Sequence, residues 1–311
     1  MSLSTKKPSK KKPLYVGRFA PSPTGPLHFG SLVAAMASYL DALAHQGQWL
    51  VRMEDIDPPR EVPGAASQIL ATLENFGLQW HGSVRYQSER SDAYEAVLEN
   101  LQENGLAYYC QCSRKQLAPF NGVYPGTCRQ KALPNSDAAL RLKLAATRID
   151  FADALQGVQQ IHLDQIGDFI LKRRDSLYAY QLAVVVDDHD QQVSHIVRGI
   201  DLMDSTFRQI ALMNTLGWQP PKYAHLPVIV NAQQQKLSKQ SFAPAIDDLV
   251  GRKPDEKIKI VHQVLTCLGF RDVPETSELD KLLQWAVSHW RLDRLQGITS
   301  IPDPSSPNSS Q

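Results

Sequence analysis

The chain has 311 residues, of which 42% are hydrophobic and 21% are charged, as in a soluble globular protein of one or two domains. No apolar run approaches the ~20 residues that span a bilayer, and residues 1–12 lack the apolar segment of a secretory signal. These features exclude a transmembrane or exported protein. We therefore expect a cytoplasmic monomer that does not associate with membranes.

The net charge of +1 is unevenly distributed. Five of the 33 basic residues are lysines within residues 1–13, which leaves 28 basic against 32 acidic residues in the remainder. We expect residues 1–13 to form a disordered basic tail. Residues 301–311 have no apolar periodicity and are predicted to form a second disordered tail.

The first third of the chain alternates strand and helix patterns. Residues 14–19 and 49–55 read as strands, and apolar residues at three- and four-residue steps predict helices from Ser31 and from Tyr94. The order strand, helix, strand, helix predicts an α/β fold on a parallel sheet.

Residues 108–165 break this rhythm with three cysteines and short strand-like pieces, which indicates an insertion. Strand patterns return at 180–186, 193–199 and 226–230, with a helix over 207–216, and the pattern is helical from residue 246. We expect two halves of a nucleotide-binding catalytic domain, 14–107 and 166–245, and a helical C-terminal region over 246–300.

Charged residues end several predicted strands, at the edge where an open parallel sheet binds its ligands. Arg18 ends the first strand, Glu54 the second, and Arg198 the strand over 193–199. Residues 187–189, Asp-Asp-His, are interpreted as an acidic turn after a strand, with a supporting role beside this edge. Asp201 is a candidate to hydrogen-bond a nucleotide.

The segment FAPSPTGPLHFGS, residues 19–31, joins the first strand to the first helix. Such a turn offers backbone N–H groups and the positive end of a helix to a phosphate. Gly25 and Gly30 would let a nucleotide lie against the main chain. A lone His28 would be read as a cap or a packed side chain, but the glycines favour donation to a phosphate oxygen. The spacing fits neither GxxxxGK[ST] nor GxGxxG.

Two lysines, Lys236 and Lys239, lie in the polar segment QQQKLSKQS, residues 233–241. Ammonium groups on a loop can follow a departing pyrophosphate and stabilise the transition state more than the ground state. By itself this segment is more typical of a solvated basic turn.

Three of the four cysteines, Cys110, Cys112 and Cys128, lie within nineteen residues, whereas Cys267 is interpreted as a core residue. In a chain without an export signal, this clustering favours thiolates on a zinc ion over disulfides. The alternative is a group of buried reduced cysteines. A fourth ligand would be Tyr124, a carboxylate or water.

Together these segments resemble the class I aminoacyl-tRNA synthetases. PSPTGPLHFGS resembles their HIGH motif, with Phe29 and Ser31 in place of its isoleucine and last histidine. KLSKQ resembles their KMSKS loop, with Leu237 and Gln240 in place of methionine and the last serine. RFAPSPTG, EDID, and YQLAVVVDDH followed by IVRG are similar to the glutamyl branch. The resemblance covers about residues 14–245 and implies a Rossmann-like parallel sheet with a zinc-bearing insertion.

Only about 65 residues follow the segment that carries Lys236 and Lys239, which we call the lysine loop. Glutamyl-tRNA synthetases continue there into an anticodon-binding region. The chain therefore resembles the truncated glutamyl-queuosine paralogues of that family. This resemblance implies activation of L-glutamate with ATP and Mg²⁺ to glutamyl-adenylate. It further implies transfer to the queuosine base in the anticodon of tRNA(Asp).

The resemblance also implies the site residues. The glutamate site would consist of Arg18, Phe19, Ala20, Pro21, Ser22, Glu54, Tyr180 and Arg198. ATP would bind His28, Gly30, Lys236 and Lys239, with His28 and Lys239 catalytic. One structural zinc would bind Cys110, Cys112, Tyr124 and Cys128.

Two other functions are compatible with the sequence. One is a truncated glutamyl-tRNA synthetase that acts on a tRNA acceptor end. The other is a catalytically inactive, tRNA-binding synthetase-like protein, which the retained His28, Gly30 and Lys239 disfavour.

Overall fold

A computed structural model describes residues 15–144, 148–231, 233–236, 246 and 254–304. Its helices are α1 Phe29–Ala44, α2 Ala65–Asn75, α3 Ser91–Glu103, α4 Arg114–Leu117, α5 Tyr180–Asp190, α6 Met203–Thr215, α8 Pro254–Cys267 and α9 Leu279–Ser288. Its strands are β1 Val16–Phe19, β2 Gln48–Met53, β3 Arg85–Tyr86, β4 Ala107–Cys110, β5 Ala139–Leu142, β6 Arg148–Asp153, β7 Gly157–His162, β8 Ile170–Lys172, β9 His195–Gly199, β10 Lys222–Leu226, β11 Val228–Val230 and β12 Ser300–Pro302. No helix in these ranges is both long and apolar enough to span a membrane.

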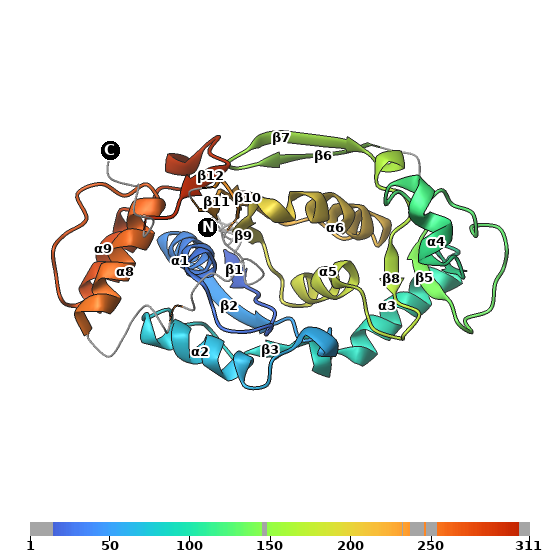
Figure 1. Cartoon of the computed structure of the whole chain (residues 1–311), viewed down its shortest axis with the longest axis horizontal. Coiled ribbons are helices and arrows are strands. Elements are labelled where there is room, and N and C mark those ends of the chain that lie inside the picture. The colour runs from blue at the N-terminus through green and yellow to red at the C-terminus, as the bar shows by residue number, and fades with distance from the viewer. Residues whose placement is uncertain (1–14, 145–147, 232, 237–245, 247–253, 305–311) are drawn as a thin grey trace, which may run out of the picture.

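The centre of the molecule is a parallel arrangement of short strands, as the sequence predicts. β1, β2 and β3 pair in parallel, and β10 pairs in parallel with β9 and with β6. The two groups lie side by side, since the backbone N–H of Ser194 donates to the carbonyl of Val16 at 2.9 Å. Figure 1 shows α5 and α6 beside this central region. The α/β fold is confirmed.

The predicted insertion contributes to two sheets. β4, β5 and β8 form a small antiparallel sheet beside α4 at one end of the molecule (Figure 1). The hairpin of β6 and β7 instead extends the sheet of β9 and β10. The other domain boundaries stay predictions.

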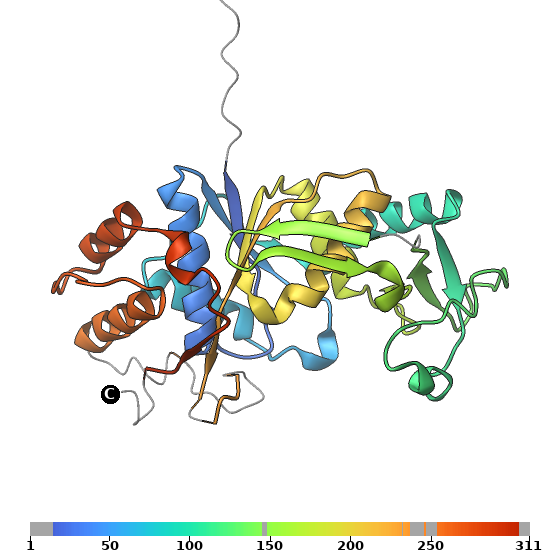
Figure 2. The same cartoon turned by 90° about the horizontal axis from the view of Figure 1, so that it is seen from above.

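α1, whose first residues line the site, is deeply packed. Leu32, Met36 and Leu40, each four residues after the last, are completely buried. They belong to a core cluster that also contains residues of α8 and α9, which lie at the opposite end of the molecule from α4 (Figure 2). This packing fixes the start of α1 relative to the strands.

The strand predicted over 180–186 is wrong, because these residues form the first part of helix α5. Leu182, Ala183 and residues 184–186, all valines, are buried. An apolar run buried on every side has no helical periodicity, and its valines mimic a central strand. The acidic residues 187–189 consequently lie in the last turn of α5 and not in a turn after a strand.

The disordered tail predicted from residue 301 is wrong for its first residues, because residues 300–302 form strand β12. β12 pairs in parallel with β11, and the N–H of Asp303 donates to the carbonyl of Val230 at 2.8 Å. A three-residue strand is too short to show a period. Residues 1–14 and 305–311 lie outside the described residues.

Candidate active site and metal cluster

A cavity of about 310 Å³ opens at the carboxyl ends of β1, β2 and β9. It is lined by Arg18, Phe19, Ala20, Pro21, Ser22, His28, Gly30, Glu54, Tyr180, Arg198 and Lys236, among others. These are the predicted glutamate and ATP residues except Lys239, which lies outside the described residues. The residues predicted to lie at one edge of the sheet therefore line a single cavity. Their individual roles stay predictions.

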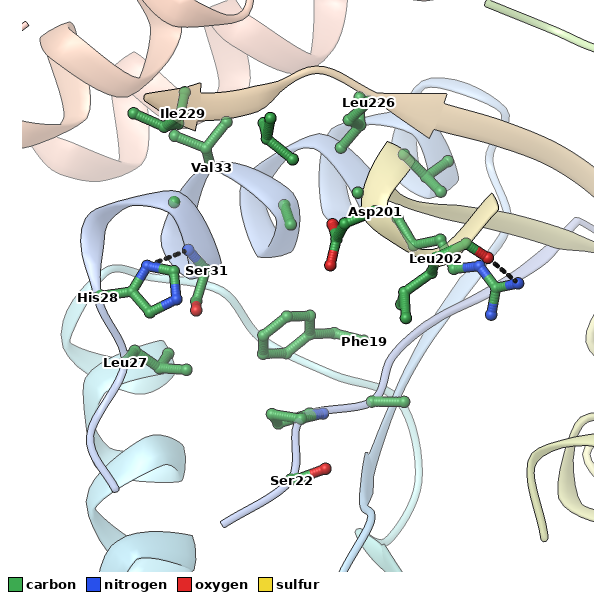
Figure 3. A pocket seen from close by; sticks show the side chains of 18 of the residues that line it. Phe19, Ser22, Leu27, His28, Ser31, Val33, Asp201, Leu202, Leu226 and Ile229 are labelled. Carbon is green, nitrogen blue, oxygen red and sulfur yellow. Dashed lines mark hydrogen bonds between the residues drawn. The ribbon is translucent and has the colours of Figure 1, made fainter. Parts of the chain in front are cut away.

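The start of α1 forms one wall of this cavity, which Figure 3 shows together with Phe19 and Asp201. His28 caps the helix, since its Nδ1 accepts from the N–H of Ser31 at 3.3 Å. In a neutral ring this bond places the proton on Nε2, which makes Nε2 a donor. A Cβ atom at Gly30 would lie 3.2 Å from the His28 ring, so glycine leaves room for the ring.

Arg18 is held from behind by a buried carboxylate. Its Nε and Nη2 donate to Oδ1 and Oδ2 of Asp188 at 3.2 and 3.4 Å. Arg52 donates to the same carboxylate at 2.8 Å. Burial would raise the pKa of Asp188, but Arg18 and Arg52 hold it below its usual value. Asp188 is therefore a fixed negative charge that supports Arg18 from outside the lining of the cavity.

Glu54 lies directly after β2 and shares Arg52 with this cluster. Nη2 of Arg52 donates to Oε1 of Glu54 at 3.2 Å, which leaves Oε2 as the oxygen for a ligand. Burial raises the pKa of Glu54, against the opposing effect of Arg52 and Arg18. An ammonium group bound at Oε2 would favour the ionised form.

Arg198 enters the cavity from β9. Its Nη2 donates to Oγ1 of Thr206 at 2.7 Å and to Oε1 of Gln209 at 2.8 Å. Its Nη1 is buried and has no hydrogen-bond partner in the part of the chain that the structure describes. Tyr180 begins α5 in the same cavity, and burial raises the pKa of its phenol, which is therefore neutral.

Lys236 and Asp201 form an ion pair at the cavity wall, with Nζ 2.6 Å from Oδ2. Both side chains are exposed, so the pair contributes little to folding. Asp201 was expected near the nucleotide, and the structure places it beside the first lysine of the predicted loop.

Sequence reasoning missed Arg52 and assigned Asp188 only a supporting role. Arg52 interrupts the apolar strand WLVRM, and Asp188 follows the apolar run LAVVV. A charge inside a buried run needs a partner, because an unpaired buried charge is very costly. That rule indicates that each of the two charges needs a buried partner, although it does not identify the partner.

The charges of the cavity suit an amino acid with a second carboxylate. Among the lining residues, Arg18, Arg198 and Lys236 carry three positive charges, and Glu54 and Asp201 carry two negative charges when ionised. The net charge of +1 complements a ligand with two carboxylates and one ammonium. Arginine is the residue best suited to hold carboxylates.

The three clustered cysteines converge in the insertion. Their sulfur atoms lie within 4.8 Å of one another, and no disulfide joins them. Oη of Tyr124 lies 3.3 Å from Sγ of Cys110 and 3.9 Å from Sγ of Cys112. Three soft sulfur donors and a phenol oxygen could hold one metal ion.

The environment of the cluster favours a thiolate at Cys110, whereas burial and the neighbouring cysteines raise the pKa of the Cys112 thiol to about 11. Burial opposes ionisation of Cys110, but its hydrogen bond with Tyr124 and the nearby Arg141 help to lower the pKa of the thiol to about 7. The guanidinium of Arg141 lies 3.9 Å from the centre of the Tyr124 ring. The residues therefore fit a cation that binds through sulfur.

Comparison with known proteins agrees with this site. Residues 15–282 match the family model of the class I tRNA synthetases (E and Q), catalytic domain. The chain is 50% identical over 292 residues to the glutamyl-Q tRNA(Asp) synthetase of Pseudomonas aeruginosa, covering 93% of this chain and 98% of that protein. It is 48% identical over 300 residues to that of Salmonella typhi, covering 96% and 98%.

The fold is also similar to a solved structure. A glutamate tRNA ligase from Elizabethkingia meningosepticum, determined in complex with its amino acid, superposes with a TM-score of 0.76 at 24% identity, over 93% of this chain and 67% of that one. The chain therefore belongs to the class I tRNA synthetases of the E and Q type and is a ligase of that class.

Proposed function

We propose that the protein activates L-glutamate with ATP and transfers the glutamyl group to the queuosine base of tRNA(Asp). The observation that carries the first half is the cavity in which Arg18, Arg198 and Glu54 meet at the start of α1. The names of the curated relatives support the choice of queuosine. A cytoplasmic location is part of this proposal, because the curated relatives are tRNA synthetases.

In the proposed complex, Arg18 and Arg198 hold the two carboxylates of glutamate and Glu54 holds its ammonium group. Tyr180 and Ser22 add neutral hydrogen bonds, and residues 19–21 supply the wall beside them. Nη1 of Arg198 would gain its missing partner from a substrate carboxylate. The two arginines thus distinguish glutamate from amino acids with a neutral side chain.

Activation needs no nucleophilic side chain of the protein. A carboxylate oxygen of glutamate attacks the α-phosphorus of ATP, and pyrophosphate leaves to give glutamyl-adenylate. His28 donates from Nε2 to a phosphate, and Gly30 keeps that ring in place. Lys236 and Lys239 stabilise the charge on the departing pyrophosphate, and Mg²⁺ binds the phosphates. A nucleophile on the queuosine base then attacks the activated carbonyl carbon and releases AMP.

We assign zinc to the cysteine cluster, with Cys110, Cys112, Cys128 and Tyr124 as ligands. Zinc prefers four ligands and binds thiolates at about 2.3 Å. The cluster lies in the insertion, away from the cavity residues, so the role of the ion is structural.

The test of the proposal is transfer of labelled glutamate to tRNA(Asp) with and without queuosine. We expect labelling only of the queuosine-bearing tRNA. Labelling of tRNA(Glu) instead would identify a truncated glutamyl-tRNA synthetase. Absence of ATP–pyrophosphate exchange and of any transfer would identify an inactive tRNA-binding protein.

A further inference from the structure

Arg198 is anchored by a buried chain of hydrogen bonds that starts in the insertion. Oδ2 of Asp153, at the end of β6, lies 2.6 Å from Nδ1 of His225 on β10. Nε2 of His225 lies 2.8 Å from Oγ1 of Thr206, which accepts from Nη2 of Arg198 at 2.7 Å. Asp153, His225 and Thr206 are almost completely buried, and none of them lines the cavity.

Burial, charge and the order of these hydrogen bonds determine which atoms of Asp153 and His225 carry protons. Asp153 is ionised, because burial would raise its pKa but His225 and two backbone N–H groups hold it below its usual value. Burial lowers the pKa of His225, against the opposing effect of Asp153, so the ring is neutral. The proton of the ring therefore lies on Nδ1, facing Asp153, and Nε2 is an acceptor that faces Thr206 and Arg198.

This tautomer matters for Arg198. Nε of Arg198 lies 3.5 Å from Nε2 of His225, so a proton on Nε2 would point at the guanidinium. When Nε2 of His225 is an acceptor, both Nε and Nη2 of Arg198 donate to acceptors of the protein. Nη1 of Arg198 has no partner among the described residues, so this nitrogen is available to a substrate. The orientation of this one nitrogen thus depends on residues outside the cavity.

A purely structural role does not account for the whole arrangement. Oδ1 of Asp153 accepts from the N–H groups of Leu155 and Gln156 at 2.9 Å each and from the backbone N–H of His225 at 3.2 Å, so this oxygen alone closes the turn after β6 and joins it to β10. Oδ2 is not needed for that turn and is directed at His225.

We infer that Asp153, His225 and Thr206 are positioning residues, which fix Arg198 for the carboxylate of the substrate by holding one tautomer of His225. This inference rests on the proposed activation of glutamate. It assigns part of the substrate specificity to β6, β10 and α6, behind the cavity.

The first experiment compares Thr206→Val with Thr206→Ser in ATP–pyrophosphate exchange. Valine keeps the shape but removes the hydroxyl, whereas serine keeps the hydroxyl. Loss of a hydrogen bond to a charged group should raise KM for glutamate by about tenfold or more in Thr206→Val. KM for ATP should change less than about twofold, and Thr206→Ser should restore KM for glutamate.

Thr215→Val is the matched control. Thr215 ends the same helix, nine residues after Thr206. Its hydroxyl donates to the carbonyl of Ala211 at 2.8 Å and not to the chain of hydrogen bonds at Arg198. Its KM for glutamate should equal that of the wild type. An unchanged KM for glutamate in folded Thr206→Val, or an equal rise in both KM values, would overturn the inference. A wild type without glutamate-dependent exchange would instead refute the proposed function.

A second experiment does not depend on activity or on the fold of Thr206→Val. Asp153→Asn keeps volume. The N–H groups of Leu155 and Gln156 hold the amide oxygen, so the amide NH2 takes the place of Oδ2 and faces Nδ1 of His225 as a donor. Nitrogen-15 imidazole spectra should show the Nδ1–H tautomer of His225 in the wild type and the Nε2–H tautomer in Asp153→Asn. An Nε2–H tautomer in the wild type, or the same tautomer in both proteins, would contradict the inference.

Discussion

The guanidinium of Arg18 and the carboxylate of Asp188 form a buried pair, although 170 residues separate them in the chain. Arg52 joins the same carboxylate at 2.8 Å and carries the interaction to Glu54. The two ends of the proposed glutamate site, one cationic and one anionic, therefore share a single supporting cluster: Arg18, Arg52, Glu54 and Asp188.

Asp188→Asn should destabilise the protein by about 3 kcal/mol at neutral pH, because two buried arginines lose their counter-charge. KM for glutamate should rise as Arg18 loses its alignment. Thermal unfolding and ATP–pyrophosphate exchange measure the two effects. A melting temperature equal to that of the wild type would contradict this account of the cluster.

The effect of Asp188→Asn should depend on pH in one direction. The folded-state pKa of Asp188 lies below its ordinary value of about 3.9, so its stabilisation is present above that value. It is lost as the pH falls through the lower folded-state pKa. The difference in unfolding free energy between wild type and Asp188→Asn should therefore shrink below about pH 4.

Glu54→Gln, an equally conservative change in the same cluster, should have the opposite effect on stability. The pKa of Glu54 is raised in the folded state, so its ionised form costs stability once the pH exceeds its ordinary value of about 4.3. The variant should melt at a higher temperature at pH 7, with a gain that disappears toward pH 4. Glutamate-dependent exchange should nevertheless fall strongly, because the amide cannot pair with an ammonium group. A lower melting temperature at pH 7 would show that Arg52 depends on the Glu54 charge.

The site residues differ in how far they could be predicted from the sequence. Arg18, Glu54 and Arg198 were predictable because each ends or follows a strand of an open parallel sheet, where ligands bind. Asp188 is in contact with Arg18 only because α5 turns its last residues toward β1. That contact could not be predicted, since the apolar run before Asp188 was read as a strand. The hairpin of β6 and β7 was likewise hidden, because its pairing with β10 joins segments about 70 residues apart.

Gly30→Ala should lower activity with little change in stability. The new Cβ would lie 3.2 and 3.3 Å from Cε1 and Nδ1 of the His28 ring, which must shift to accommodate it. Alanine is otherwise favoured over glycine in a helix by up to about 1 kcal/mol. We expect the exchange rate to fall about tenfold, in line with a displaced acid–base or donor group. Wild-type exchange would show that the ring position is unimportant.

Lys236→Ala and Lys239→Ala should reduce adenylate formation much more than glutamate binding. The exposed pair of Lys236 with Asp201 contributes at most about 1 kcal/mol to stability, so folding should be unaffected by its loss. Exchange rates and calorimetric glutamate affinities separate the two effects. Exchange at the wild-type rate in Lys239→Ala would remove this lysine from the mechanism.

Cys128→Ser should lose bound zinc, because the cluster then has too few thiolates for a stable site. Cys267→Ser is the control, since Cys267 is a buried cysteine outside the cluster. Metal analysis should give one zinc per chain in the wild type and in Cys267→Ser. Full zinc content in Cys128→Ser would exclude the cluster as the zinc site.

Tyr124→Phe tests the fourth ligand separately. The phenylalanine keeps the ring beneath Arg141 but removes the oxygen, which also accepts from the N–H of Cys128 at 2.9 Å. We expect zinc to be retained at high concentration and released to a chelator at least about tenfold faster than from the wild type. An unchanged release rate would favour water as the fourth ligand.

The central claim is that a cavity lined by Arg18, Arg198 and Glu54 selects an amino acid that carries a second carboxylate. ATP–pyrophosphate exchange with glutamate, glutamine and aspartate at equal concentration tests it most directly. The account predicts strong exchange with glutamate, at most weak exchange with glutamine, and intermediate exchange with aspartate, which carries both carboxylates on a shorter side chain. Equal exchange with glutamine, whose side chain has no charge, would contradict it.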